Sequence, residues 1–325
     1  MRVPRDRLPQ DTAVWHGFLR DYFCDKDAVT TDLAGDVRLQ LCWPDDAERH
    51  VDPDLGIGLR WWGGGVTLGS MWSARWREGR IMTSLYDTWT LLSWSEWLAR
   101  VVPSTTERVV ILHVDDHRDM GSPRLHLTNR ALVDSITNEE VRLMVPSTVQ
   151  RAIESGAIGM GSFITPFLWQ CPQVTVRHLC QPPKMQGNVR KMFMITSAPD
   201  TLLDPDADRL AIKFSEKTTD TWNYLGTNDT ALWSRNIEGR PALLHIDMDY
   251  FNNRYDGDSA WDLRTPRLDP DLPTMLSKVD DLISALAASK VIIEDVSIAY
   301  SPGFFPAEFW QPVDLHLRAG LARIL

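Results

Sequence analysis

Two short segments of the chain hold residue types that bind divalent metal ions. The first contains Asp115, His117 and Asp119, and the second contains Asp247 and Asp249. Because side chains alternate across an extended chain, the first three are expected to share a face, and so are the last two. Four carboxylates that converge on one place would repel one another strongly without cations. The two segments together therefore predict a metal centre.

The donor types of this predicted centre favour particular ions. Carboxylate oxygens with one imidazole suit Mn²⁺ well and Fe²⁺ or Co²⁺ less well, whereas a zinc site of the thiolate type is not indicated. Two ions that share carboxylates would lie about 3.5–4 Å apart and could deprotonate one bridging water. We therefore expect two Mn²⁺ ions per chain and a hydroxide nucleophile. Either motif alone is equally typical of a solvated acidic loop, and it is their combination that favours a metal site.

Two further histidines lie close to the predicted ligands in sequence. His113 and His245 each precede a ligand aspartate by two residues and share its face of the strand, one step deeper in the sheet. They either hydrogen-bond to the metal ligands or are ordinary core histidines with satisfied ring nitrogens.

The elements that must position these residues form a pattern of alternating strands and helices. Both clusters follow apolar runs and should lie at the carboxyl ends of buried strands, where open α/β sheets place their sites. The predicted strands are 80–86, 108–115, 174–179, 191–196, 242–248 and 291–299, and the predicted helices are 90–101, 149–155 and 273–289. Gly156 is expected to end the second helix. The polar stretches 199–208 and 215–230 are expected to be loops. The pattern predicts an α/β fold of three layers, with a mostly parallel sheet flanked by helices.

The first 80 residues differ from the rest of the chain and are expected to form an N-terminal extension to a metal-binding domain at 81–325. A helix near 12–23, strands at 37–43 and 57–62, and a hairpin at the glycines 63–65 are predicted. This part is therefore partly β. Nine of the 14 tryptophans precede residue 100. Such rings either contact a peptide or fill a core.

The amino-acid composition limits the kinds of partner and the cellular location that are expected for this chain. A net charge of −10 argues against a nucleic-acid partner and is compatible with a cationic substrate or with a plain acidic surface. No apolar stretch is long enough for a membrane span, and no signal peptide is evident. The four cysteines form no Cys-x-x-Cys pair, so a reducing cytoplasm is the expected location. A homo-oligomer remains compatible with the sequence.

The motifs resemble those of the ureohydrolase (arginase-like) superfamily. That family carries Asp-Ala-His-x-Asp after one strand and Asp-x-Asp after a later strand, which match 115–119 and 247–249 here. The chain is most similar to the branch of peptide arginases, which convert arginine in ribosomally made precursor peptides to ornithine and release urea. The segments 113–119, 245–251 and 300–305 bear this likeness, which covers roughly 81–310.

The resemblance implies roles for the predicted ligands. Asp115 and Asp247 would bridge the two ions, and His117 and Asp249 would complete one of them. Asp119 would bind the other ion and help to orient the hydroxide. The hydroxide would attack the guanidinium carbon, and the tetrahedral intermediate would collapse to urea and an amine.

Three family features have no direct counterpart. Relatives supply another histidine where this chain has 86–89. Either Asp87 or a water would replace it, or the first ion would be bound weakly or not at all. The glutamate that holds the substrate in arginases is matched near Ala299, so guanidinium binding would come from Glu294, Glu308 or an aspartate of the loops, such as Asp87. The proton-shuttling histidine has no match at its spacing.

Two other parts of the chain lie near the expected places of site residues in the family. His126 lies near the expected place of the proton shuttle and is either catalytic or a plain loop histidine. The loop 159–166, which contains Ser162, lies where relatives have the mouth of the site, and its glycines either permit close approach of a substrate or form an ordinary turn.

The resemblance implies an Mn²⁺-dependent hydrolase that cuts the guanidinium of arginine in a precursor peptide. Two alternatives remain. The missing histidine and glutamate are compatible with an accessory, peptide-binding protein that retains the fold, or with a metal hydrolase that acts on another amide or amidine.

Overall fold

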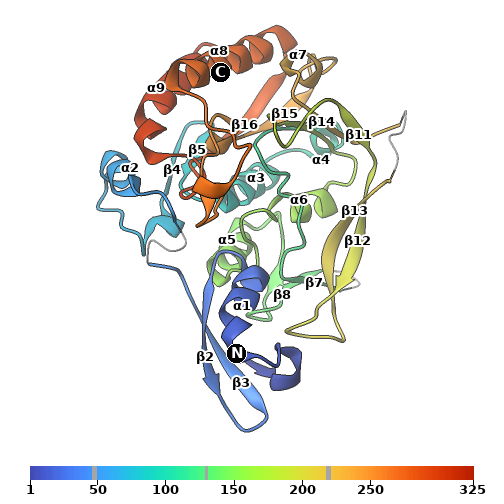
Figure 1. The fold of residues 1–325 in the computed structure, drawn as a ribbon. Helices are drawn as coiled ribbons and strands as arrows, with labels where there is room; N and C mark the ends of the chain where they lie inside the picture. The colour runs from blue at the N-terminus through green and yellow to red at the C-terminus, as the bar shows by residue number, and fades with distance from the viewer. Residues whose placement is uncertain (46–49, 129–130, 217–220) are drawn as a thin grey trace.

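The computed structural model describes residues 1–45, 50–128, 131–216 and 221–325 (Figure 1). Its centre is an eight-stranded sheet. The strands follow the order β11 (Val189–Lys191), β14 (Tyr224–Thr227), β10 (Thr175–Leu179), β6 (Val110–Val114), β15 (Pro241–Asp247), β16 (Ile292–Ala299), β5 (Ile81–Ser84) and β4 (Arg75–Glu78). The six central strands are parallel, and β11 and β4 close the two edges in antiparallel orientation. The predicted α/β fold with a mostly parallel sheet is confirmed.

Helices cover both faces of this sheet, as the side chains of β16 show. Asp295 accepts a hydrogen bond from Ser93 of α3 (Thr90–Leu98) on one face. On the other face the ring of Tyr300, just past the strand, packs on Trp310 of α9 (Trp310–Leu321), with 5.3 Å between ring centroids. Side chains an odd number of residues apart point to opposite faces of a strand, so these two helices lie on opposite sides.

The remaining helices join one of these two layers. On the first side, α3 packs against α5 (Pro146–Ser155) and α6 (Ile164–Gln170), and on the second side α9 packs against α8 (Leu272–Ser289). Figure 1 shows α8 and α9 next to each other, far from the N-terminal strands. The short helices are α4 (Pro103–Thr106) and α7 (Thr230–Trp233), of which α7 contacts α8. Gly156 ends α5 in the left-handed conformation (φ 89°), as predicted.

The first 80 residues belong to two different parts of the fold and not to the single extension that was predicted. A three-stranded antiparallel sheet, in the order β1 (Arg2–Pro4), β3 (Asp36–Cys42) and β2 (Asp27–Asp32), packs with α1 (Trp15–Phe23) on a small core of its own. Residues 55–78, in contrast, belong to the main body: β4 is an edge strand of the central sheet. The boundary at residue 80 therefore does not correspond to a break in the structure.

The segment 57–62 is a helix and not the predicted strand. It forms most of α2 (Leu55–Trp62), which Gly63 ends with a φ of 81°, so the glycine run is a helix terminus and not a hairpin. The apolar residues of this segment suit a strand or a helix, so the sequence pattern alone does not distinguish the two, and packing in the folded chain does. Gly58 lies so close to α9 that a Cβ atom there would be 2.6 Å from the ring of Trp310. A helix without a side chain at this position can approach the neighbouring helix closely.

A third sheet borders the central one and contains residues predicted in part as loop. Its order is β12 (Phe193–Pro199), β13 (Asp208–Phe214), β7 (Leu125–Leu127), β8 (Leu132–Asp134) and β9 (Glu140–Val141). The predicted loop 199–208 is the turn between β12 and β13. The predicted loop 215–230 instead contains β14 and the start of α7, while its residues 217–220 lie outside the described residues.

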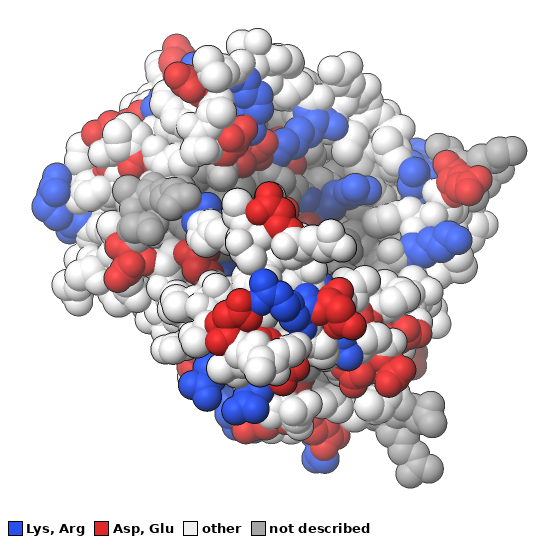
Figure 2. Space-filling model, turned by 60° about the horizontal axis from the view of Figure 1, so that its bottom comes forward, with Lys and Arg blue, Asp and Glu red and all other residues white. Residues whose placement is uncertain are grey.

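Most tryptophans of the first 100 residues contribute to packing. Trp15, Trp89, Trp94 and Trp97 are buried, and the other early tryptophans except Trp76 are partly buried against the main core. Acidic and basic side chains are interspersed over the face shown in Figure 2. Among the described residues no helix is long and apolar enough to cross a membrane.

Candidate metal centre

The site lies where the strand order of the central sheet reverses. The chain runs outward from β6 through β10 to β14 and then returns to β15 on the other side of β6. His113 of β6 pairs in register with His245 of β15, so Asp115 and Asp247 both follow two residues later at the carboxyl ends of adjacent parallel strands. A crevice at such a reversal is the usual ligand site of an open α/β sheet. The two predicted motifs thus lie side by side at the strand ends that border this crevice.

The first ligand segment does not continue as an extended strand. Strand β6 ends at Val114, and Asp119 adopts a left-handed conformation with a φ of 51°. His117, Asp119 and also Asp116 line the same cavity. The alternation of side chains expected for an extended chain therefore does not hold across this segment. The loop folds back on itself, and a two-residue period applies only within the strand.

One candidate ligand group consists of Asp115, His117 and Asp249. The Nδ1 atom of His117 lies 2.8 Å from Oδ2 of Asp249, and its backbone N–H donates to Oδ1 of Asp115 at 2.5 Å. The backbone N–H of Asp116 donates to Oδ1 of Asp249 at 3.0 Å. One ligand atom from each member of the group lies within 4.8 Å of the others. The two strand ends thus bring one imidazole and two carboxylates to a single point.

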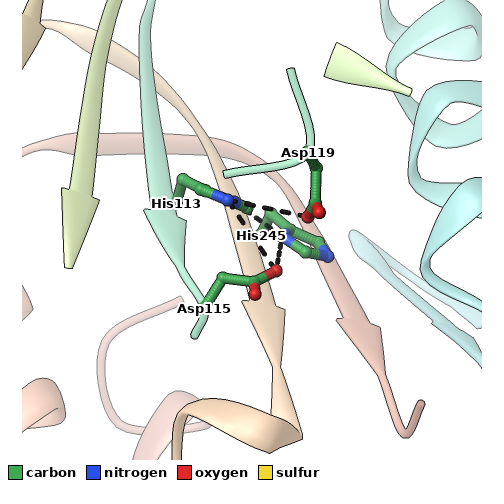
Figure 3. A group of neighbouring side chains, drawn as sticks. All are labelled: His113, Asp115, Asp119 and His245. Atoms are coloured by element: carbon green, nitrogen blue, oxygen red, sulfur yellow. Dashed lines mark hydrogen bonds and ion pairs between the residues drawn. The ribbon is translucent and has the colours of Figure 1, made fainter. Parts of the chain in front are cut away.

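A second group consists of His113, Asp115, Asp119 and His245, and Figure 3 shows these side chains pointing toward one another. The Nε2 atom of His113 lies 3.7 Å from Oδ2 of Asp115 and 3.7 Å from Oδ2 of Asp119. Neither carboxylate oxygen receives a hydrogen bond within the described part of the chain, although both are buried. Buried oxygens without a donor are costly. These two atoms are therefore suited to a cation.

The carboxylate of Asp247, at the end of β15, is held by hydrogen bonds from the segment that follows it and from the segment that follows β16. Its Oδ1 accepts the backbone N–H of Asp249 at 3.0 Å, and its Oδ2 accepts the hydroxyl of Ser301 at 2.5 Å. Ser301 follows β16 and has a φ of 45°. Both contacts orient the carboxylate toward the cavity that it lines. Such support is typical of residues around metal ligands.

Four aspartates of the site have raised pKa values. Burial, helped by the charges of neighbouring aspartates, raises the pKa of Asp87, Asp115 and Asp247 well above the ordinary value. Burial likewise raises the pKa of Asp119 to about 6. Such shifts disfavour the ionised carboxylates, and they are expected where buried aspartates lie together without a compensating cation.

His117 and Asp249 behave in the opposite way because they pair with each other. Burial by itself would lower the pKa of His117, but the charge of Asp249 and hydrogen bonds to nearby carboxylates raise it well above its usual value. Burial would raise the pKa of Asp249, but His117 outweighs this effect and lowers it.

The site opens into a cavity of ≈ 1020 Å³. Asp87 lines this cavity, as predicted, and is 4 % exposed. The apolar part of the wall includes Met120, Met160 and Phe214, and its basic residues are Arg118, Lys184 and Lys191. The cavity is therefore acidic at its base and both apolar and basic along its walls.

Three contributors to the site were not predicted from the sequence. Asp25 lines the cavity from the N-terminal part and accepts the backbone N–H of Met160 at 3.0 Å. Lys184 lies 3.1 Å from Oδ2 of Asp116, 2.6 Å from Oδ1 of Asp256 and 2.7 Å from Nε2 of His117. Asp25, Lys184 and Asp256 lie in segments without a motif, so the sequence offered no signal for them.

Four predicted residues lie elsewhere, and none of them is among the described residues that line the cavity. His126 binds Asp200 at 3.0 Å in a network away from the site, so it is not placed to shuttle protons. Glu308 pairs with Arg254 at 2.6 Å. Glu294 lies near the start of β16, whereas the site is at the end of that strand.

Ser162 is the fourth of these residues. It is buried, and its hydroxyl bonds to Gly159 within the loop. Only its neighbours Met160 and Gly161 reach the cavity.

Comparison with models of known protein families and with curated proteins found no match to this chain.

Proposed function

We propose that this protein is a metal-dependent, arginase-like hydrolase that cleaves the guanidinium C–N bond of an arginine within a peptide, leaving ornithine and releasing urea. The observation that supports this best is the convergence of His117 with Asp115, Asp119 and Asp249, while Asp247 lines the same cavity. Two of the buried carboxylate oxygens, one on Asp115 and one on Asp119, receive no hydrogen bond from the described residues. The sequence motifs at 115–119 and 247–249 resemble those of the ureohydrolases and lie on these two strand ends.

Each ligand has a distinct place in this proposal. Asp115 and Asp247, at the ends of adjacent strands, would be shared between two Mn²⁺ ions, and His117 with Asp249 would complete one ion. Asp119 would belong to the other ion. Bound there, a pair of such ions acidifies a water so that a nucleophile is available at neutral pH.

The cavity supports an arginine side chain as substrate. A guanidinium is always charged, and Asp87 offers it a buried carboxylate beside the predicted ligands. Met120, Met160 and Phe214 offer apolar surface to the methylene stem. The volume of ≈ 1020 Å³ is at the upper end of the roughly 300–1,000 Å³ of ordinary small-molecule pockets, which favours a peptide over free arginine.

The test is incubation of the Mn²⁺-loaded chain with arginine-containing peptides, followed by urea detection and mass spectrometry. We expect urea together with the mass loss of arginine-to-ornithine conversion. The variant Asp247→Ala should abolish both, whereas His126→Asn, outside the cavity, should retain them. Peptide binding without mass change would support the accessory role instead. Hydrolysis of another amide or amidine with arginine left intact would support the third possibility.

A further inference from the structure

Three histidines form a row directly beneath the predicted metal ligands. His178, His113 and His245 pair in register on the adjacent strands β10, β6 and β15. Their ring centroids are 4.7 Å and 5.0 Å apart, and all three side chains are buried. A row of three buried imidazoles needs partners for six ring nitrogens.

The nitrogens of His178 are both committed to hydrogen bonds. Its Nδ1 lies 2.8 Å from the hydroxyl of Tyr224, and its Nε2 lies 2.9 Å from the backbone carbonyl of Asp115. His178 therefore holds the backbone of the ligand loop and has no nitrogen left for an ion.

His113 is arranged differently. Its Nδ1 lies 2.9 Å from Nδ1 of His245, and its Nε2 points between the two carboxylates of Asp115 and Asp119 (Figure 3). The distance from Nε2 to the unpartnered Oδ2 atom is 3.7 Å in both cases. Ligand atoms about 2.1 Å from one ion are about 3.0 Å apart at a 90° angle and about 3.6 Å apart at 120°. The two observed distances suit ligands of a single ion, and one atom from each of the three residues lies within 4.8 Å of the others.

We propose that His113 is a ligand of the second ion, together with Asp115 and Asp119, and that it takes the place of the histidine absent from 86–89. This proposal rests on the metal centre of the proposed function, but not on the identity of the substrate.

The surroundings of His113 agree with this role. A histidine that binds an ion through Nε2 carries its hydrogen on Nδ1 and donates it to a neighbour, and Nδ1 of His245 is in place to accept it. Without an ion, Nε2 lies 3.0 Å from the carbonyl oxygen of His117 and donates to it. If His113 bound an ion through Nε2, its hydrogen would lie on Nδ1, and the carbonyl of His117 would no longer accept a hydrogen bond from Nε2.

The first experiment measures manganese per chain after Mn²⁺ loading and removal of free ion. Wild type should hold two ions, His113→Asn should hold one, and His126→Asn, a histidine outside the cavity, should hold two. Circular dichroism of the same samples checks that each variant is folded. A folded His113→Asn chain that still holds two ions at wild-type affinity overturns the proposal.

The second experiment does not depend on a variant. Crystals of the wild-type chain grown with Mn²⁺ should show an anomalous peak about 2 Å from Nε2 of His113. Two ions that both lie away from His113, or no second ion, contradict the proposal. The outcome is also separable from the proposed function. Urea release with no ion on His113 refutes only the ligand assignment, and an ion on His113 without urea release refutes only the reaction.

Discussion

The substitution Asp119→Asn should have opposite effects on stability with and without metal. Asp119 is buried, and its Oδ2 receives no hydrogen bond from the described residues. Its φ of 51° favours asparagine as the replacement, because asparagine adopts the left-handed conformation more readily than most residues. The backbone contact from Ile164 to its carbonyl, 3.2 Å, is unaffected by the change. The variant therefore removes charge and little else.

The size of the effect follows from the pKa of this carboxyl group. Burial raises it from 3.8 to about 6. That difference means that keeping Asp119 ionised at neutral pH costs the ion-free chain about 3 kcal/mol. Asparagine avoids this cost and can donate an N–H to Asp115. We expect the ion-free variant to be more stable than wild type by about 1–3 kcal/mol, a rise in Tm of at least roughly 2 °C.

The assay is thermal unfolding at pH 7.5 in chelator and again in excess Mn²⁺. In chelator the variant should unfold at a higher temperature than wild type, and in Mn²⁺ at a lower one, because it has lost a ligand. Asp200→Asn is the control, since hydrogen bonds from Tyr22 and His126 outweigh burial and lower the pKa of Asp200. It should destabilise the chain under both conditions. A lower Tm of Asp119→Asn in chelator would refute the reasoning.

The other predictions concern pH, substrate binding and packing. Because the folded pKa of Asp119 lies above its unfolded value, the stability it contributes is present at low pH and is lost as pH rises through about 6. The difference in Tm between ion-free Asp119→Asn and wild type should therefore shrink as pH falls from about 7.5 to about 5.5. A difference that stays the same or grows at about pH 5.5 would contradict this. Asp87→Asn should raise the KM for an arginine-containing peptide by roughly ten- to a hundredfold and leave the metal content unchanged. The reason is that one charge-assisted hydrogen bond contributes about 1.5–3 kcal/mol. An unaltered KM would exclude Asp87 from guanidinium binding. Gly58→Ala should destabilise the chain by about 1–3 kcal/mol in urea unfolding, because the new Cβ would meet the ring of Trp310. Gly56→Ala in the same helix meets only Arg60 at 3.5 Å and should be neutral or stabilising by up to about 1 kcal/mol, so equal effects of the two changes would argue against the clash.

The strands and the place of the site could be predicted because their signals are local. Runs of apolar residues around 108–115 and 242–248 indicated buried parallel strands, and the position of acidic residues at their ends followed from that assignment. Segment 57–62 could not be assigned in the same way, since its apolar residues suit a strand or a helix. In the structure it is a helix whose Gly58 packs closely against Trp310, about 250 residues further along the sequence.

The walls of the cavity could not be predicted for a related reason. Asp25 reaches the site only because the N-terminal part folds back beside the loop that contains Met160. Lys184 and Asp256 meet His117 through loops that carry no motif. His126 was predicted near the site because it follows the ligand segment closely in the sequence. It is not among the described residues that line the cavity, because closeness along the chain does not fix where a side chain lies in the fold.

The register that pairs His113 with His245 joins residues 132 positions apart. During synthesis β6 leaves the ribosome long before β15 exists, so its aspartates cannot meet their partners until most of the chain has been made. On the proposed function, metal uptake would therefore follow the pairing of β6 with β15. Acquisition of the ions would then mark the point at which β15 has joined the central sheet.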